Sequence, residues 1–210
     1  MIVVTTCYAI EARWIERRTG VHLVRTPIGE RAHEAMGALL SRGVEPISTL
    51  VSTGFCGGLL PELQIGDLVL ADVVRHRGEE ILVSPKLLQR AKAALDLGRY
   101  APRTGTCESV PYVAGAANKR RFSDAGAVSV DMESGPLARW ARRKKVPFLS
   151  LRVVLDPLNV DLPFSVHDSP LGLALRHPAL SLRLARSAVH AGRRLGRALN
   201  DLMPSLKEGP

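Results

Sequence analysis

The chain is poor in aromatic residues and in long apolar runs, and each shortage excludes a class of protein. Aromatic residues make up 4% of the 210 residues, which leaves few rings for the base-stacking surfaces of proteins that bind single-stranded nucleic acid. No apolar run approaches the roughly 18 residues that cross a bilayer. The first six residues resemble a strand and carry no basic leader, so we expect no signal peptide.

Cysteine is scarce as well, and neither cysteine nor histidine is spaced for ligand binding. The three cysteines, Cys7, Cys56 and Cys107, are an odd number at wide spacing. This pattern predicts free thiols in a reducing cytoplasm rather than a disulfide framework. The chain has no CxxC motif, and none of its six histidines forms a pair with ligand spacing. We therefore expect no metal and no organic cofactor.

Acidic residues are outnumbered by basic ones, 20 to 29, which gives a formal net charge of +9. Much of the excess lies near the end of the chain, where residues 176–197 hold six arginines, two histidines and no acid. Leucines and alanines interleave with the arginines, so residues 179–199 are predicted to form a basic amphipathic helix. Its apolar face would pack on the core, or it would attach to an anionic membrane surface at the inner face of the membrane. No nucleic-acid motif is present.

Strand and helix signals alternate along the chain, which predicts a single α/β domain over residues 1–210 with three layers and a central mixed sheet. Residues 32–40 have helical spacing, with Gly43 placed to end the helix. Residues 47–52 read as a strand that enters a glycine-rich loop at 53–58. Residues 68–74 read as a further strand. The pair Ser84-Pro85 is typical of a helix start, and Gly98 is placed to end that helix. Residues 157–170, with three prolines, predict a loop.

Two acidic side chains stand where predicted strands end. A short strand at 128–130 leads through Val130-Asp131-Met132-Glu133-Ser134 into a helix predicted over 131–143, and the apolar run 148–155 ends at Asp156. Ligands of α/β sheets bind at this edge. One carboxylate could hold a hydroxyl while the other passes a proton, which is the equipment for cleaving a glycosidic bond to a purine. Each acid also has a structural reading, Asp156 as a turn residue and Glu133 as a helix-start charge.

Three blocks carry a resemblance to the nucleoside phosphorylase and nucleosidase family, on its methylthioadenosine/S-adenosylhomocysteine nucleosidase side. The first runs from Ser52-Thr53-Gly54-Phe55-Cys56-Gly57-Gly58-Leu59 through Ile65-Gly66-Asp67-Leu68-Val69 to Asp72. The second is residues 130–134, which resemble Val-Glu-Met-Glu. The third is residues 151–156, which resemble Arg-x-x-Ser-Asp, although Leu155 stands where the family often has serine. The order and spacing of the blocks agree over roughly residues 1–165, so together they are a strong family signal.

The resemblance implies roles for three residues at the scissile bond. Asp156 would act as the general acid that protonates N7 of the purine, because a protonated base leaves more easily than its anion. Glu133 would bind the ribose hydroxyls, with Met132 packed against the sugar. A fixed carboxylate there stabilises the positive charge that builds on the sugar.

It also implies contacts for the base and for the attacking group. Glu11, just after the first strand, would orient a water, whereas Gly29 and Arg31 lie where phosphorylases of the wider family approach phosphate. Tyr112 and Gly57 are the candidates at the base. The residues leave water and phosphate both open as acceptor, and the subfamily resemblance described next slightly favours phosphorolysis.

The short chain, the Val-Asp-Met-Glu-Ser motif and the tail around Leu175-Arg176-His177-Pro178-Ala179 look most like the hopanoid-associated phosphorylases, which release adenine from adenosylhopane. A methylthioadenosine/S-adenosylhomocysteine nucleosidase and a futalosine hydrolase are the alternatives within the family. Two readings lie outside it: a non-catalytic nucleoside-binding protein, and an anionic-surface or RNA-binding protein that uses the arginine-rich helix. Members of the family are usually homo-oligomers, so we expect a homodimer.

Overall fold

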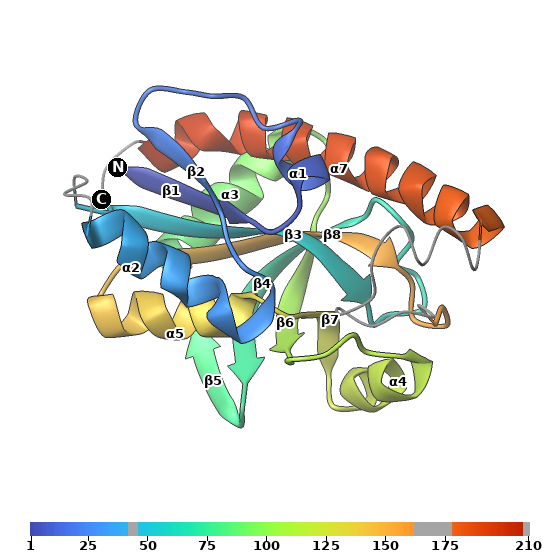
Figure 1. Cartoon of the computed structure of the whole chain (residues 1–210). Coiled ribbons are helices and arrows are strands. Elements are labelled where there is room, and N and C mark those ends of the chain that lie inside the picture. Colours follow the sequence, from blue (N-terminus) through green and yellow to red (C-terminus); the bar gives the residue numbers. More distant parts are fainter. Residues whose placement is uncertain (42–45, 162–177, 208–210) are drawn as a thin grey trace.

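A computed structural model of the chain describes residues 1–41, 46–161 and 178–207, and in these residues strands and helices alternate (Figure 1). The strands are β1 Ile2–Thr6, β2 Val21–Arg25, β3 Thr49–Gly58, β4 Leu68–His76, β5 Glu79–Leu82, β6 Arg103–Ser109, β7 Ala127–Asp131 and β8 Phe148–Asp156. The helices are α1 Ala9–Ala12, α2 Glu34–Ser41, α3 Pro85–Leu97, α4 Ala116–Asp124, α5 Ser134–Lys144 and α7 Pro178–Lys207, with a 3-10 helix, η1, at Gly29–His33.

The strands form one mixed sheet that curls into a ring. The order is β2-β1-β3-β7-β6-β4-β5, and β8 pairs with both β3 and β4. Because β3 pairs with β7 as well as β8, and β7, β6 and β4 are successive neighbours, five strands close on themselves. At the closure Gly57 is in register with both Val130 and Asp156. The carboxyl ends of β3, β7 and β8 therefore meet at one place.

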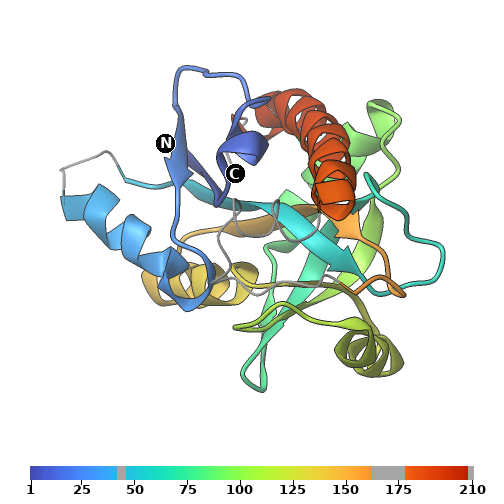
Figure 2. The same cartoon turned by 45° about the vertical axis from the view of Figure 1, so that its right-hand side comes forward.

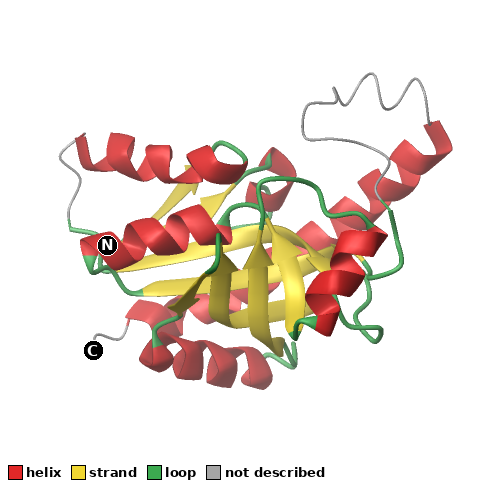
Figure 3. Ribbon diagram, turned by 90° about the horizontal axis from the view of Figure 1, so that it is seen from below, coloured by secondary structure: helices red, strands yellow, loops and turns green. Residues whose placement is uncertain are grey.

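Helices cover both faces of this sheet (Figure 3). α1, α3 and α7 pack together on one face, where Figure 2 shows α1 beside α7, and α2, η1 and α5 lie on the other. The main cluster of buried apolar side chains extends from Ile2 in β1 to Leu206 in α7, so both ends of the chain contribute to burial. The predicted α/β fold, with a mixed central sheet flanked by helices, is confirmed.

The glycine-rich segment is strand rather than the predicted loop. β3 continues through residues 53–58 because their backbone pairs with β8 up to Asp156 and then with β7. Glycine lacks the side chain that would separate these closely packed strands. A loop was expected because of the glycine content alone. The extended backbone depends on pairing with β7 and β8, which are distant in sequence.

The C-terminal helix is longer than predicted and its second half is part of the core. α7 runs to Lys207 rather than to residue 199, because Leu202, Met203 and Leu206 continue its buried stripe. The helix comes so close to α1 that a Cβ at Gly196 would lie 2.3 Å from the Trp14 Cβ. Among the described residues no helix is long and apolar enough to cross a membrane.

Other predicted elements agree with the structure except at their ends. α3 begins at Pro85 and is capped by Gly98, as predicted, although the Ser84 side chain makes no capping hydrogen bond. α5 begins at Ser134 and not at 131, because Asp131 still belongs to β7. Gly43 and most of the loop predicted at 157–170 lie outside the described residues.

Candidate active site

Glu11 is a buried carboxylate whose position is fixed by four hydrogen bonds. It lies in α1, just after β1, and its side chain is almost fully buried. Its Oε2 accepts from Thr6 Oγ1 at 2.5 Å and from the backbone N–H groups of Cys7 and Tyr8 at 3.0 and 2.9 Å. Its Oε1 accepts from the backbone N–H of Phe55 at 2.9 Å, its one donor among the residues that the structure describes. Since a carboxylate oxygen has two lone pairs, Oε1 can accept a further donor such as water.

Gly54 allows Glu11 to lie beside Arg152. A Cβ at position 54 would be 2.8 Å from Glu11 Oε1 and 2.9 Å from Arg152 Nη1, closer than real side chains approach. The φ angle of Gly54 is +143°, which L-residues rarely adopt. Both constraints require glycine here. Gly54 of the first sequence block is in register with Arg152 of the third, so the two blocks are in contact.

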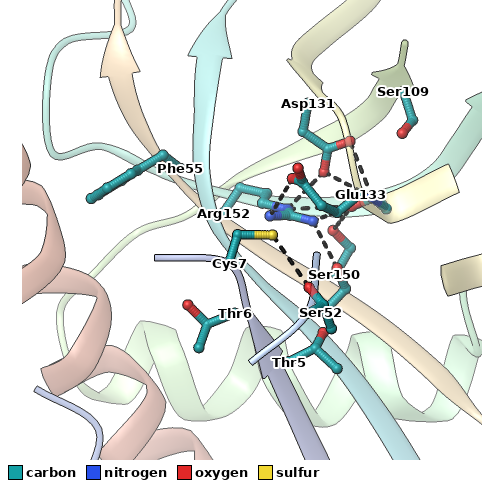
Figure 4. A network of polar contacts seen from close by, with 12 residues as sticks. Thr5, Thr6, Cys7, Ser52, Phe55, Ser109, Asp131, Glu133, Ser150 and Arg152 are labelled. Carbon is teal, nitrogen blue, oxygen red and sulfur yellow. Dashed lines mark hydrogen bonds and ion pairs between the residues drawn. The ribbon is translucent and has the colours of Figure 1, made fainter. Parts of the chain in front are cut away.

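Arg152, in the middle of β8, is the buried cation at the centre of the site (Figure 4). Its Nε pairs with Asp131 Oδ2 at 2.7 Å, and its Nη1 lies 3.7 Å from Glu133 Oε2. Its Nη2 donates to Ser52 Oγ at 2.7 Å and to Ser134 Oγ at 3.0 Å. Burial opposes the charge, but Asp131 and Glu133 outweigh it and raise the pKa of the guanidinium. The cation therefore joins β3, β7 and β8.

Glu133 lies at the N-cap position of α5 and is nearly buried. Its Oε1 accepts the backbone N–H of Gly29 at 3.1 Å, and Gly29 adopts a φ of +71°, a conformation suited to glycine. Burial raises the pKa of Glu133 to about 7, Arg152 lowers it, and Asp131 raises it further. The ionised form of such a carboxylate can accept hydrogen bonds from sugar hydroxyls.

Asp156 ends β8 and forms an ion pair with Lys119 of α4. The glycine at position 57 leaves room for it, since a Cβ there would lie 3.3 Å from Asp156 Oδ2 and 3.0 Å from Val130 Cγ1. Burial raises the pKa of Asp156 to about 6, and Lys119 limits the rise. A carboxyl group that titrates near neutral pH can serve as a general acid.

Two aromatic side chains lie beside Glu11. The ring centroids of Tyr8 and Phe55 are 6.3 Å apart, and Tyr8 is 45% exposed. Met132 packs near Gly29, since its Cε would lie 3.7 Å from a Cβ at that position. The sequence offered one weak signal for the two aromatic residues, because Tyr8 lies two residues after the end of β1 and Phe55 lies within the glycine-rich block.

Some of the residues that were predicted to contact the base or phosphate are not part of this network of polar contacts. Tyr112 lies after β6 and is 39% exposed. The Arg31 side chain is 74% exposed and its Nε pairs with Glu34 at 3.0 Å, while the N–H of Gly29 is occupied by Glu133. The geometry gives the phosphate role of Gly29 and Arg31 no support, and it stays a prediction, as does the base contact of Tyr112.

Three charged residues of the site were not assigned from the sequence: Asp131, Arg152 and Lys119. Arg152 had a usable signal, because an arginine inside the apolar run 148–155 must find a buried anion. Asp131 directly precedes the predicted ribose contacts and is the partner of that arginine. Lys119 had no signal, since α4 is otherwise a polar helix and its burial comes from packing against the end of β8.

These observations define a class of protein: an α/β enzyme with buried carboxylates at the carboxyl ends of its strands. Among the described residues no group of three or more histidine, cysteine or acidic side chains is arranged to hold a metal ion. The chain belongs to the phosphorylase superfamily, whose family profile matches residues 13–170. Membership confirms the predicted superfamily and the prediction of an enzyme that cleaves N-glycosyl bonds.

Solved structures with the same fold include nucleosidases. The 5′-methylthioadenosine/S-adenosylhomocysteine nucleosidase of S. pneumoniae, with a transition-state inhibitor, aligns with a TM-score of 0.75 at 15% identity over 98% of this chain and 99% of that one. The S-adenosylhomocysteine nucleosidase of Streptococcus pyogenes gives 0.73 at 17% over 98% and 96%. The futalosine hydrolase of Helicobacter pylori gives 0.73 at 16% over 97% of each chain. At these identities the likeness establishes the fold.

Proposed function

We propose that the protein cleaves the N-glycosidic bond of an adenine nucleoside. Asp156 protonates N7 of the base, Glu133 binds the ribose hydroxyls beside Met132, and Glu11 orients the attacking group. The observation that carries the proposal is the gathering of buried carboxylates where β1, β7 and β8 end: Glu133 lies near the buried guanidinium of Arg152, Asp156 is paired with Lys119, and Glu11 is held by backbone N–H groups. A nucleoside-binding protein would have no need for a buried acid that titrates near neutral pH.

The charge balance of the site suits a positively charged transition state. Arg152 pairs closely with Asp131 at 2.7 Å, whereas Glu133 lies 3.7 Å away from it. Glu11 is held by neutral donors alone. The carboxylates therefore exceed the cation, and the surplus negative charge can stabilise an oxocarbenium-like sugar.

For the acceptor, the geometry favours water over phosphate. Within the described parts of the chain, Glu11 Oε1 accepts one hydrogen bond and can accept a second, while the Arg31 side chain is exposed and pairs with Glu34. If water is the acceptor, base release should continue at the same rate when phosphate is omitted, and Glu11→Gln should lose most of its turnover. Loss of turnover without phosphate, together with weaker phosphate use by Arg31→Ala, would support phosphorolysis instead.

The direct test is base release from methylthioadenosine, S-adenosylhomocysteine, futalosine and adenosylhopane, each with and without phosphate. Wild-type protein should release the base from at least one of them, and Asp156→Asn should not. Asp124→Asn is the matched control, because Asp124 is exposed at the end of α4. Tight nucleoside binding with no release from any compound would favour the binding-protein alternative.

Within this activity we propose adenosylhopane as the substrate. Methylthioadenosine, S-adenosylhomocysteine and futalosine are the alternatives. The support is the first half of α7, which extends past the strand ends (Figure 1). Leu182 is 53% exposed, and Leu184 and Val189 are only partly covered. Arg183 and Arg186 are exposed beside them. An apolar face flanked by arginines fits an anionic lipid surface.

Vesicle binding tests this part separately. The double variant Arg183→Glu/Arg186→Glu should lose binding to anionic vesicles and turnover of vesicle-borne adenosylhopane. Lys92→Glu/Lys144→Glu, at exposed sites on α3 and α5, should lose neither. Fast cleavage of a soluble nucleoside, with adenosylhopane untouched and no vesicle binding, would overturn the lipid assignment. If light scattering shows a dimer that the α7 variant disrupts, the same face is covered by a second copy. The homodimer and the cytoplasmic location stay predictions.

A further inference from the structure

Lys119 is a fully buried lysine that none of the proposed chemical steps uses. It belongs to α4, and its Nζ forms an ion pair with Asp156 Oδ2. The same Nζ donates to the backbone carbonyls of Pro157 at 3.0 Å and Val160 at 2.9 Å, with the carbonyl of Asp156 at 3.4 Å. Among the described residues, its polar contacts are therefore with Asp156 and the turn that follows β8.

This arrangement fixes the ammonium and, through it, one oxygen of the carboxyl group. A lysine has three N–H donors, and two are used by the carbonyls of a single turn, so little freedom remains for the third. Oδ2 of Asp156 is thereby held, and Oδ1 is the oxygen left to face a ligand. The site is tightly packed, since a Cβ at Gly57 would lie 3.1 Å from Lys119 Cε.

We propose that Lys119 is a positioning residue for Asp156, whose ammonium holds Oδ2 and balances the negative charge that forms when Asp156 protonates the departing base. The proposal rests on the function proposed above. In the step, the proton passes from Asp156 Oδ1 to N7, and the electron pair of the glycosidic bond moves onto the base. Asp156 is left as a carboxylate beside the ammonium, and solvent later returns the proton.

Two opposing electrostatic effects set the protonation state of Asp156. Burial favours the neutral acid, and Lys119 favours the carboxylate; the outcome is a pKa of about 6. Of the other charged groups at the strand ends, Asp131 and Arg152 are paired with each other. Without Lys119, Asp156 would hold its proton more tightly and release it less readily to the base.

The test compares Lys119→Met, which removes the charge, with Lys119→Arg, which keeps it. Arg120→Met is the matched control, because Arg120 is the next residue of α4 and ties it to the same turn through Asn159 Oδ1 at 3.2 Å without reaching Asp156. Lys119→Met should lower kcat by about 10- to 1,000-fold, a part of the general-acid contribution. The deficit of Lys119→Met relative to wild type should be greatest at pH 6 and below, and it should shrink by pH 9, because the variant keeps more of its Asp156 protonated at high pH than wild type does. The arginine variant and the control should follow the wild-type pH profile.

Carboxyl carbon NMR titration of Asp156 supplies a readout that needs no activity. In Lys119→Met the midpoint should rise by about one to three pH units, and in the other two variants it should stay within half a unit of wild type. A deficit that is the same at every pH, with an unchanged Asp156 midpoint, would overturn the proposal and leave Lys119 as a packing residue. If wild type releases no base from any nucleoside, the proposed function fails, and the titration still decides whether Lys119 controls Asp156.

Discussion

Replacing Glu133 with glutamine should make the protein more stable at alkaline pH, although it should impair the enzyme. Glu133 is buried, and its pKa is raised from 4.5 to about 7, chiefly by burial. A carboxyl with a raised folded-state pKa stabilises the protein fully below its unfolded pKa, and this contribution is lost as pH rises through the folded value. Glutamine resembles the protonated acid, can still accept the N–H of Gly29, and has no proton to lose.

The size of the effect follows from linkage. Between pH 5 and pH 8 the folded carboxyl passes from almost fully protonated to almost fully ionised, whereas the unfolded one is mostly ionised throughout. The pKa of Glu133 is displaced from 4.5 to about 7 in the folded protein. Because of this displacement, wild type should lose roughly 2 to 3 kcal/mol of unfolding free energy between pH 5 and pH 8. For a chain of this size that corresponds to a Tm difference of about 5 to 10 °C.

The assay is thermal unfolding of wild type and Glu133→Gln at intervals from pH 5 to pH 8. The two curves should lie close together at pH 5 and separate as pH rises, with the variant higher. Glu62→Gln is the control at an exposed carboxyl, 60% exposed beside Arg103, and its curve should run parallel to wild type. Parallel curves for Glu133→Gln would refute the reasoning, because the carboxylate would then be as well stabilised in the fold as in water.

Three further predictions concern activity and packing. Asp156→Asn should lower kcat by about 10²- to 10⁴-fold with nucleoside binding retained, because an amide cannot donate the proton; steady-state kinetics with direct binding measurements checks this, and near-normal turnover would remove Asp156 from its role. The pH profile of kcat/KM should be a bell centred near pH 6.5, since Asp156 must be protonated and titrates at about 6, while Glu133 must be ionised and titrates at about 7; a flat profile from pH 5 to 8 would contradict this pairing. Gly54→Ala should lower Tm and abolish base release, because its Cβ would lie 2.8 Å from Glu11 Oε1 at a φ of +143°. Gly37→Ala in α2, with nothing within 4 Å, should keep activity and gain about 0.5 to 1 kcal/mol, so equal Tm values for the two variants would count against the clash.

The fold could be predicted because its signals are local. Alternating apolar segments place β4 and β8 within two residues of their observed ends, and Ser84-Pro85 with Gly98 marks the bounds of α3. The closed ring could not be predicted, because β8 pairs with β4 in an antiparallel register that no local pattern encodes. The glycine-rich half of β3 was missed for the same reason, since its extended backbone depends on two partners distant in sequence.

The site was predictable only where its residues follow strands. Asp156 and Glu133 could be located because a polar residue after an apolar run lies at the edge of a sheet. Lys119 could not, because its side chain reaches the site from a helix whose position depends on the completed fold. The C-terminal helix shows a related limit: the sequence predicted its amphipathic pattern, but only packing against Trp14 distinguishes the buried half from the exposed one.

The ring closure is the physical link between the three sequence blocks. β3 and β7 pair through only two residue pairs, Gly57 with Val130 and Gly58 with Ser129. Yet this short contact sets the distance between the ribose-binding candidate Glu133, which follows β7, and the general-acid candidate Asp156, which ends β8. Arg152 reinforces the closure, since it binds Asp131 of β7 and Ser52 of β3 from its place in β8. The carboxylates would repel one another in an open sheet, and the buried guanidinium is the attraction that holds the strand ends together. The same arginine therefore ties the three strands together and holds Asp131 and Glu133 near one another, which accounts for a buried cation at the centre of a mostly apolar strand.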